Sequence, residues 1–333
     1  MLMPPSFMKF RKGAKMQSNP ATPMKKIFLS IKRAISAVIA FIHREKIAAF
    51  ICCLPFVVGF FTFLIVPMGM SLYYSFTRFN MLSDPVWIGF DNYLRMLDDS
   101  RFWSSLVATF YFAFASVPLR LIFALAIAML LLRARRMVGI YRAMYYLPSI
   151  LGGSLAVAIL WGRLFAAQGV LNEGILELIG LNRNFPWLGN QNTAIWTLIL
   201  LAVWQFGSSM LIFLASLKQI PEQLYEASSI DGAGKVRQFF RITLPLLTPT
   251  IFFNLVMQTI AGFLAFTQAF VITRGEPMDS TLFYALYMYR QVFEFGNAGY
   301  GSAMAWVMLA IIGTITGILF LTKRFWVYDG GYA

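Results

Sequence analysis

Six long apolar segments, separated by shorter polar stretches, define the pattern of the chain beyond residue 46. Each segment is long enough to cross about 30 Å of hydrocarbon as a helix that rises about 1.5 Å per residue. The pattern therefore predicts an all-α membrane protein with six transmembrane helices. The predicted spans cover residues 47–76, 103–132, 138–165, 192–217, 245–272 and 302–322.

The stretch before these spans is basic and polar, and the segment from Ile27 to Ile42 carries apolar residues at helical spacing. Lys32, Arg33 and Ser36 occupy the other side of this segment, which is typical of a helix that lies on an anionic membrane surface. The alternative is a poorly ordered basic tail. The predicted organisation is a basic tail with this interfacial helix at 1–46, a transmembrane domain at 47–325 and a short tail at 326–333.

The distribution of Lys and Arg predicts the orientation of the spans. With the amino terminus inside, 20 of the 28 Lys and Arg residues lie on the inner side and 7 on the outer side, with Arg142 and Arg163 near the two ends of the third span counted on the side of their end. Cytoplasmic segments of membrane proteins carry an excess of these residues. We therefore expect both termini, and the loop at 218–244 between the fourth and fifth spans, to face the cytoplasm.

The composition supports the membrane class and narrows the chemistry. Hydrophobic residues make up 59% of the chain and charged residues 13%, whereas a soluble globular chain is typically about 45–50% apolar. The net charge of +14 lies in short blocks between apolar runs, which favours membrane lipid over nucleic acid as a partner. Cys52 and Cys53 are adjacent and His43 is the single histidine, so the sequence shows no metal-ligand spacing.

The sequence carries no recognisable catalytic motif. Gly234-Lys235 resembles the end of a P-loop, but Ser229 stands where the first glycine belongs and Val236 stands where Ser or Thr would bind magnesium. We therefore expect no catalytic residue, no metal site and no cofactor bound by this chain. Any ATP and magnesium chemistry is assigned to partner subunits.

The loop at 218–244 is the one sizeable polar run between two long apolar segments in the second half of the chain. Pro221 suits the first turn of a helix, and Asp231-Gly232 is turn chemistry that would end it. A second short helix is predicted from about Lys235 to Ile242, and Pro245 is expected to restart the chain into the fifth span. Two short helices at a bend form a surface that another protein can contact. An ordinary interhelical loop is the alternative.

This loop resembles the cytoplasmic coupling loop of the membrane-spanning subunits of bacterial binding-protein-dependent ABC importers. The family pattern is Glu-Ala-Ala, then Gly, then Ile-x-Leu-Pro. This chain matches it at Glu226, Ala227, Gly232, Ile242, Leu244 and Pro245, with Ser228 at the third small position. The resemblance covers residues 50–325. The residues that resemble the carbohydrate branch, which includes maltose, glycerol-phosphate and oligosaccharide permeases, are Trp204, Gln205, Ile220, Pro221, Leu224, Tyr225, Asp231, Thr273, Gly275 and Pro277.

The resemblance implies the type I fold of ABC importer permeases and a set of partners in the bacterial inner membrane. The expected partners are a second, different permease, two cytoplasmic ATP-binding subunits and an external solute-binding protein. The ATP-binding subunits would grip the loop, with Glu226 in a charge-assisted contact with one of their basic groups. The residues expected at this contact are Glu226, Ala227, Ser228, Asp231, Gly232 and Ala233.

A pathway for a polar solute needs polar groups inside the helix bundle, because unsatisfied polar atoms that face lipid are costly. The fifth predicted span carries a polar and small stripe within about 120° of arc, formed by Asn254, Gln258, Gly262, Ala265 and Gln268. The resemblance implies solute contacts on this helix, with Gln258, Gly262 and Ala265 as the nearest equivalents. Helix–helix packing through small residues is the alternative. A second polar patch lies in the fourth span, at Gln205, Gly207, Ser208 and Ser209.

Arg120 lies in the second predicted span, about 20 Å from its cytoplasmic end. A buried guanidinium costs about several kcal/mol unless it is paired, and no Asp or Glu lies in any predicted span. We hypothesise that Arg120 faces the pathway and favours an anionic solute, such as an acidic oligosaccharide. The alternatives are pairing with backbone carbonyls, an outward-reaching side chain, or an acid on the partner subunit.

These patterns favour a permease subunit that forms, with a second permease, the pathway of an ATP-driven importer for a sugar or an oligosaccharide. An ion-coupled secondary transporter of a polar solute is the alternative. Such transporters usually carry intramembrane acids and inverted repeats, and the sequence shows neither.

Overall fold

The computed structural model describes residue 32 and residues 45–133, 137–176 and 185–328. The predicted interfacial helix at 27–42 lies, except for Lys32, outside the described residues. The chain divides into two compact units, one ending at Met68 and the other beginning at Gly69. The described part of the first unit contains α2 (Glu45–Phe60), the π-helical turn η1 (Phe61–Ile65) and the start of α3 (Val66–Ser75).

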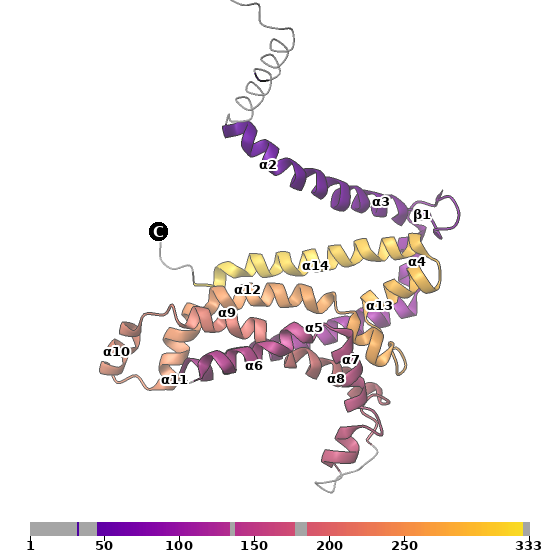
Figure 1. Cartoon of the computed structure of the whole chain (residues 1–333). Helices are drawn as coiled ribbons and strands as arrows, with labels where there is room; N and C mark the ends of the chain where they lie inside the picture. The colour runs from indigo at the N-terminus through magenta and orange to yellow at the C-terminus, as the bar shows by residue number, and fades with distance from the viewer. Residues whose placement is uncertain (1–31, 33–44, 134–136, 177–184, 329–333) are drawn as a thin grey trace, which may run out of the picture. The chain divides into compact units, whose positions relative to one another are not determined.

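The second unit is almost entirely helical (Figure 1). Its two short strands, β1 (Thr77–Arg78) and β2 (Val86–Trp87), pair antiparallel with Thr77 opposite Trp87. The elements that follow are α4 (Asp91–Asp98), α5 (Ser100–Arg133), α6 (Val138–Leu151), α7 (Leu155–Leu164), η2 (Leu171–Leu176), α8 (Gln191–Trp204), α9 (Gly207–Leu217), α10 (Glu222–Ile230), α11 (Lys235–Gln238), η3 (Phe239–Thr243), α12 (Leu244–Phe263), η4 (Ala269–Thr273), α13 (Tyr284–Tyr289), η5 (Arg290–Glu294) and α14 (Ala298–Trp326).

The long helix α5 is the element against which the second unit packs, because it contacts α8, α9, α12 and α13. Small residues on α5, such as Ala113, Ala124 and Ala128, are buried and allow neighbouring backbones to approach closely. Apolar side chains gather in one cluster around the first half of α5 and in another around its second half. α12 contacts α5 and also lies along α14 (Figure 1).

Each of the six predicted apolar segments overlaps one candidate span. Among the described residues, four helices are long and apolar enough to cross a membrane alone: Ala49–Ser75, Ser100–Leu132, Lys235–Phe263 and Ala298–Trp326. Two further pairs qualify as bent helices, α6 with α7 at 95° and α8 with α9 at 42°. The all-α fold class is therefore confirmed, with two of the six spans broken.

The breaks have local causes that hydropathy alone does not register. Gly152-Gly153 follows α6, and glycine is a poor helix former. Ser154 then caps α7, because its side-chain oxygen accepts a hydrogen bond from the backbone N–H of Val157. The fourth span breaks at Gln205-Phe206, immediately before Gly207.

The fifth predicted span begins and ends at the wrong residues. The helix runs without interruption from Lys235 to Phe263, so Pro245 does not restart the chain. Proline lacks a backbone N–H, so a helix tolerates it at positions where no N–H is needed as a donor. Here it follows the π-helical turn η3, in which Leu244 N–H bonds to the carbonyl of Phe239, and it lies in the first turn of α12. The helix ends at Phe263, well before residue 272.

Candidate functional site

The loop between α9 and α12 is a short helix followed by a tight turn. α10 ends at Ile230, and Asp231 N–H and Ala233 N–H bond to the carbonyls of Ala227 and Ser228. Gly232 adopts φ +77°, a left-handed conformation that glycine takes without a steric penalty. The predicted break at Asp231-Gly232 is therefore confirmed, and the residues chosen for the ATPase contact lie on α10 and this turn.

Residues that the sequence reasoning did not single out hold α10 against the next helix. The amide of Gln238 donates to the hydroxyls of Ser228 (2.9 Å) and Ser229 (2.8 Å) and to the carbonyl of Tyr225 (3.2 Å). The Tyr225 hydroxyl lies 2.9 Å from that of Thr243. These bonds join residues 9 to 18 positions apart across the turn, a spacing that no helical periodicity indicates.

α10 is an exposed helix. Within the described part of the chain, no residue of α10 is buried. Glu226 and Ala227 face solvent, and Ile230 is 87% exposed. Most of the length of α10 is therefore accessible to a partner protein.

In the middle of the bundle, Arg120 joins three other helices. Its Nε donates to the carbonyl of Ala202 on α8 at 2.6 Å, and its Nη1 donates to Oε1 of Gln258 on α12. The Gln258 amide nitrogen donates in turn to Oγ of Ser209 on α9 at 3.1 Å. The backbone-carbonyl alternative is therefore realised here. Gln258 also makes a bond to Arg120 that sequence reasoning did not predict.

The predicted stripe on the fifth span holds only in part. Asn254 is 1% exposed and bonds back to the carbonyl of Thr250, and a Cβ on Gly262 would lie 3.4 Å from Ala113 on α5. Both positions thus fit the packing alternative. Ala265 and Gln268 lie beyond the last residue of α12, so the five residues do not share one helix face. The prediction was wrong there because the apolar Leu264–Phe266 stretch continues the hydropathy signal past the end of the helix.

The polar patch of the fourth span lies against the break in the third. The Gln205 amide donates to the carbonyl of Gly152 at 3.0 Å. Ser149 Oγ donates to the carbonyl of Gln205 at 2.9 Å and accepts from the N–H of Ser208 at 3.0 Å. Each broken helix therefore satisfies backbone groups that the other leaves free.

Gly207 permits this close approach, since a Cβ at that position would lie 2.3 Å from the carbonyl oxygen of Tyr145. Ser149 and Gly152 were not among the predicted residues. The Pro148 and Gly152-Gly153 signals in the third segment were the available hint.

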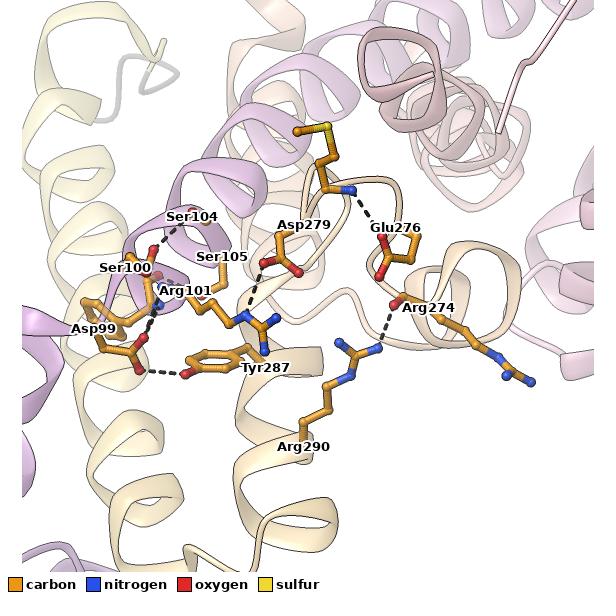
Figure 2. Close-up of polar contacts among 12 residues, drawn as sticks. Asp99, Ser100, Arg101, Ser104, Ser105, Arg274, Glu276, Asp279, Tyr287 and Arg290 are labelled. Carbon is orange, nitrogen blue, oxygen red and sulfur yellow. Dashed lines mark hydrogen bonds and ion pairs between the residues drawn. The ribbon is translucent and has the colours of Figure 1, made fainter. Parts of the chain in front are cut away.

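At the start of α5, a polar network surrounds Asp99 (Figure 2). One carboxylate oxygen accepts from the N–H groups of Arg101 (3.0 Å) and Phe102 (3.2 Å), which caps α5. The other oxygen accepts from the hydroxyls of Tyr287 (2.6 Å) and Tyr300 (2.7 Å). This network was also missed, because its members come from three separate segments, namely the start of α5, α13 and α14.

The electrostatics of this network favour an ionised carboxylate beside protonated phenols. Burial works to raise the pKa of Asp99, but the hydrogen bonds from Tyr287, Tyr300 and the two backbone N–H groups outweigh it and lower that pKa. Burial, reinforced by the hydrogen bond to Asp99, raises the pKa of Tyr287 to about 12. The network therefore stays fully formed at neutral pH.

Comparison with known proteins relates this arrangement to a family. The family model described as "Binding-protein-dependent transport system inner membrane component" matches residues 97–325. The chain is 52% identical over 290 residues to "Probable ABC transporter permease protein YesP" of Bacillus subtilis, covering 86% of this chain and 94% of that protein. It is 31% identical to "Probable starch degradation products transport system permease protein AmyD" of Thermoanaerobacterium thermosulfurigenes, covering 81% and 92%.

The fold is also similar to a solved structure. A bacterial ABC transporter involved in the import of the acidic polysaccharide alginate contains a chain that superimposes with a TM-score of 0.73 at 21% identity, covering 86% of this chain and 98% of that chain. At this identity the similarity concerns the fold, which is that of an ABC importer permease.

Proposed function

Because the chain belongs to the family of binding-protein-dependent transport system inner membrane components, we propose that it is one permease subunit of an ATP-driven carbohydrate importer. It is a multi-pass inner membrane protein of a transport family rather than a catalytic one. The carbohydrate class is supported by relatives such as the AmyD permease for starch degradation products. The proposal also includes cytoplasmic termini, as the Lys and Arg distribution predicts.

The observation that carries the mechanism is the exposed helix α10, clamped by Gln238 to an unbroken helix that enters the membrane. One of the two ATP-binding subunits contacts α10, with Glu226 bonded to a basic group and Ala227 and Ser228 allowing close approach. When these subunits close, α10 and the helix from Lys235 to Phe263 move together. This movement reaches Gln258, which lies on that helix and bonds to Arg120.

The solute path forms between this chain and a second permease. Gln258 provides an amide group that suits a sugar, the buried hydroxyl of Ser209 holds that amide in place, and Arg120 adds a positive charge beside it. An acidic oligosaccharide is the solute that this charge favours. A solute-binding protein delivers it to the outer face, where the Asp99 network lies.

Reconstitution with the neighbouring subunits tests the proposal. The chain is purified with its second permease, ATP-binding subunits and binding protein, and is placed in liposomes. We expect uptake of a maltopentaose or alginate pentasaccharide probe only with ATP inside, and ATP hydrolysis that the loaded binding protein stimulates. Uptake that follows a proton or sodium gradient without ATP would contradict the proposal and favour a secondary transporter.

Crosslinking locates the contact independently. Single cysteines at positions 226–235 should crosslink to an ATP-binding subunit, whereas a cysteine at Met278, which is 80% exposed at the other end of the unit, should not. Labelling of the α10 cysteines from outside the cell would contradict the proposed orientation.

A further inference from the structure

A groove lies at the end of α5 opposite the coupling loop, beside the ion pair that Figure 2 shows between Arg101 and Asp279. Its volume is about 610 Å³, and its walls come from α5, from the start of α8 and from the turn at 278–280. Small-molecule sites in proteins typically have volumes of about 300–1,000 Å³. None of its polar residues belongs to the predicted pathway.

One wall of this groove is an aromatic ridge. Trp103, Val107 and Tyr111 follow one another at every fourth position of α5, so their side chains share a helix face. Trp103 is 47% exposed, and its ring nitrogen is bonded to the carbonyl of Leu97 at 3.0 Å. Tyr111 is 45% exposed, and its ring meets Trp196 edge-on at 6.0 Å between centroids. Both rings are thus held in place while they remain accessible.

The opposite wall offers hydrogen-bonding groups, two of which are amides without a partner among the described residues. Gln191 and Asn192 begin α8, are exposed, and within the described part of the chain their side-chain amides make no hydrogen bond. Asp279 lies 3.3 Å from Arg101 and adds a carboxylate. The Oγ of Ser280 is buried and has no hydrogen-bond partner among the described residues. Since a buried atom is closed to a ligand in the groove, the two amides and the Asp279 carboxylate are the groups that this wall offers.

We propose that this groove is a saccharide-binding subsite that holds one end of the transported oligosaccharide at the outer face. A sugar ring has an apolar C–H face, which packs on aromatic rings, and a rim of hydroxyls, which bond to amides and carboxylates. The groove presents these two kinds of surface on facing walls. The inference rests on the proposed function, because it assumes that the importer carries a carbohydrate.

The distance along α5 gives the subsite a measurable signature. Tyr111 and Trp103 precede Arg120 by nine and 17 residues, or about 14 and 25 Å along the helix axis. A disaccharide is too short to contact the groove and the Arg120–Gln258 cluster together, whereas a pentasaccharide can. Loss of the subsite should therefore weaken transport of long saccharides more than of short ones.

The experiment measures uptake by the reconstituted importer with maltose, maltopentaose and an alginate pentasaccharide as probes. Trp103→Ala and Asn192→Ala are compared with Phe114→Ala, an exposed aromatic of α5 that does not line the groove. Each of the first two variants should raise the KM for the imported pentasaccharide about fivefold, as expected for one lost contact. The maximal rate, the KM for the disaccharide and the level of the protein in the membrane should stay unchanged.

The outcomes separate the two proposals. An unchanged pentasaccharide KM in both variants, with normal uptake by the wild-type importer, would overturn the subsite and leave the proposed function intact. Equal effects in Phe114→Ala would also overturn it, since they would indicate a lipid or partner-permease contact along α5. A wild-type importer that takes up no saccharide would overturn the proposed function, and the subsite with it.

Discussion

The two ends of the second unit are built by opposite means. At the Asp99 end, a partly buried carboxylate accepts four hydrogen bonds from α5, α13 and α14. At the α10 end, the helix has no buried residue in the described structure and is held mainly through one amide, that of Gln238. The first arrangement resists movement of its helices against one another. The second leaves a whole helix surface free for a partner.

The largest effect is expected where the network is most buried. Asp99→Ala removes the cap of α5 and leaves the hydroxyls of Tyr287 and Tyr300 without their acceptor. It should lower the free energy of unfolding by about 3 kcal/mol, measured by denaturant titration of the purified complex. Asp98→Ala, which changes an exposed neighbouring carboxylate, is the matched control.

The pH dependence checks the same network. The folded-state pKa of Asp99 is lowered, so its contribution to stability is present above the unfolded pKa of about 3.9 and is lost as the pH falls through the folded pKa. The acid limb of the stability curve should therefore be shallower in Asp99→Ala. Identical acid limbs in the wild type and the variant would show that the network adds little.

A charge reversal at the other end should alter coupling and not stability. Glu226→Lys places a like charge against the basic group proposed on the ATP-binding subunit, which costs several kcal/mol and corresponds to a loss of uptake of about a hundredfold. The stability should change by less than about 0.5 kcal/mol, because Glu226 is exposed. Uptake and ATP hydrolysis are measured in liposomes.

Gln223→Lys adds the same charge on α10 while keeping Glu226, and it should retain most of the uptake. Gly232→Pro should also uncouple hydrolysis from uptake, since proline cannot adopt the φ of +77° found there. Normal uptake in both Glu226→Lys and Gly232→Pro would rule out α10 as the site of coupling.

Between the two ends lies Arg120, and its substitution tests whether this side chain contacts the solute or only holds helices together. Arg120→Gln removes the bond to Ala202 and the charge next to Gln258. If the charge selects the solute, uptake of the alginate pentasaccharide should fall about tenfold relative to maltopentaose, a difference of about 1.4 kcal/mol. Equal losses for both saccharides would assign Arg120 to packing alone.

The smallest effect is expected at the clamp of α10. Gln238→Ala removes three hydrogen bonds at a partly exposed site, so α10 should open more often, by about 1 kcal/mol. Hydrogen exchange of the α10 amides measures this change, with the exposed neighbour Arg237→Ala as the control. Unchanged exchange would show that the Tyr225–Thr243 bond is sufficient.

The sequence predicts features that depend on neighbours along the chain. The six apolar segments and the break at Asp231-Gly232 follow from hydropathy and turn chemistry, and both agree with the structure. The bend in the third span was missed although its cause, Gly152-Gly153, is local. The bonds that Ser149, Gln205 and Ser208 exchange were missed because they form only where the two broken helices meet. Long-range pairs such as Arg120 with Gln258 leave no periodic signal.

The unbroken helix from Lys235 to Phe263 is a rod of about 40 Å, with α10 beside one end and Gln258 near the other. The angle between these two points is set by the number of residues between them, at about 100° each. In the π-helical turn η3, at the Lys235 end of the rod, the backbone N–H groups bond to carbonyls five residues earlier, so this turn contains more residues than an α-helical turn. The position of α10 therefore fixes the direction in which the Gln258 side chain points. A single residue inserted between them would turn Gln258 away from Arg120 without altering the sequence at either end of the rod.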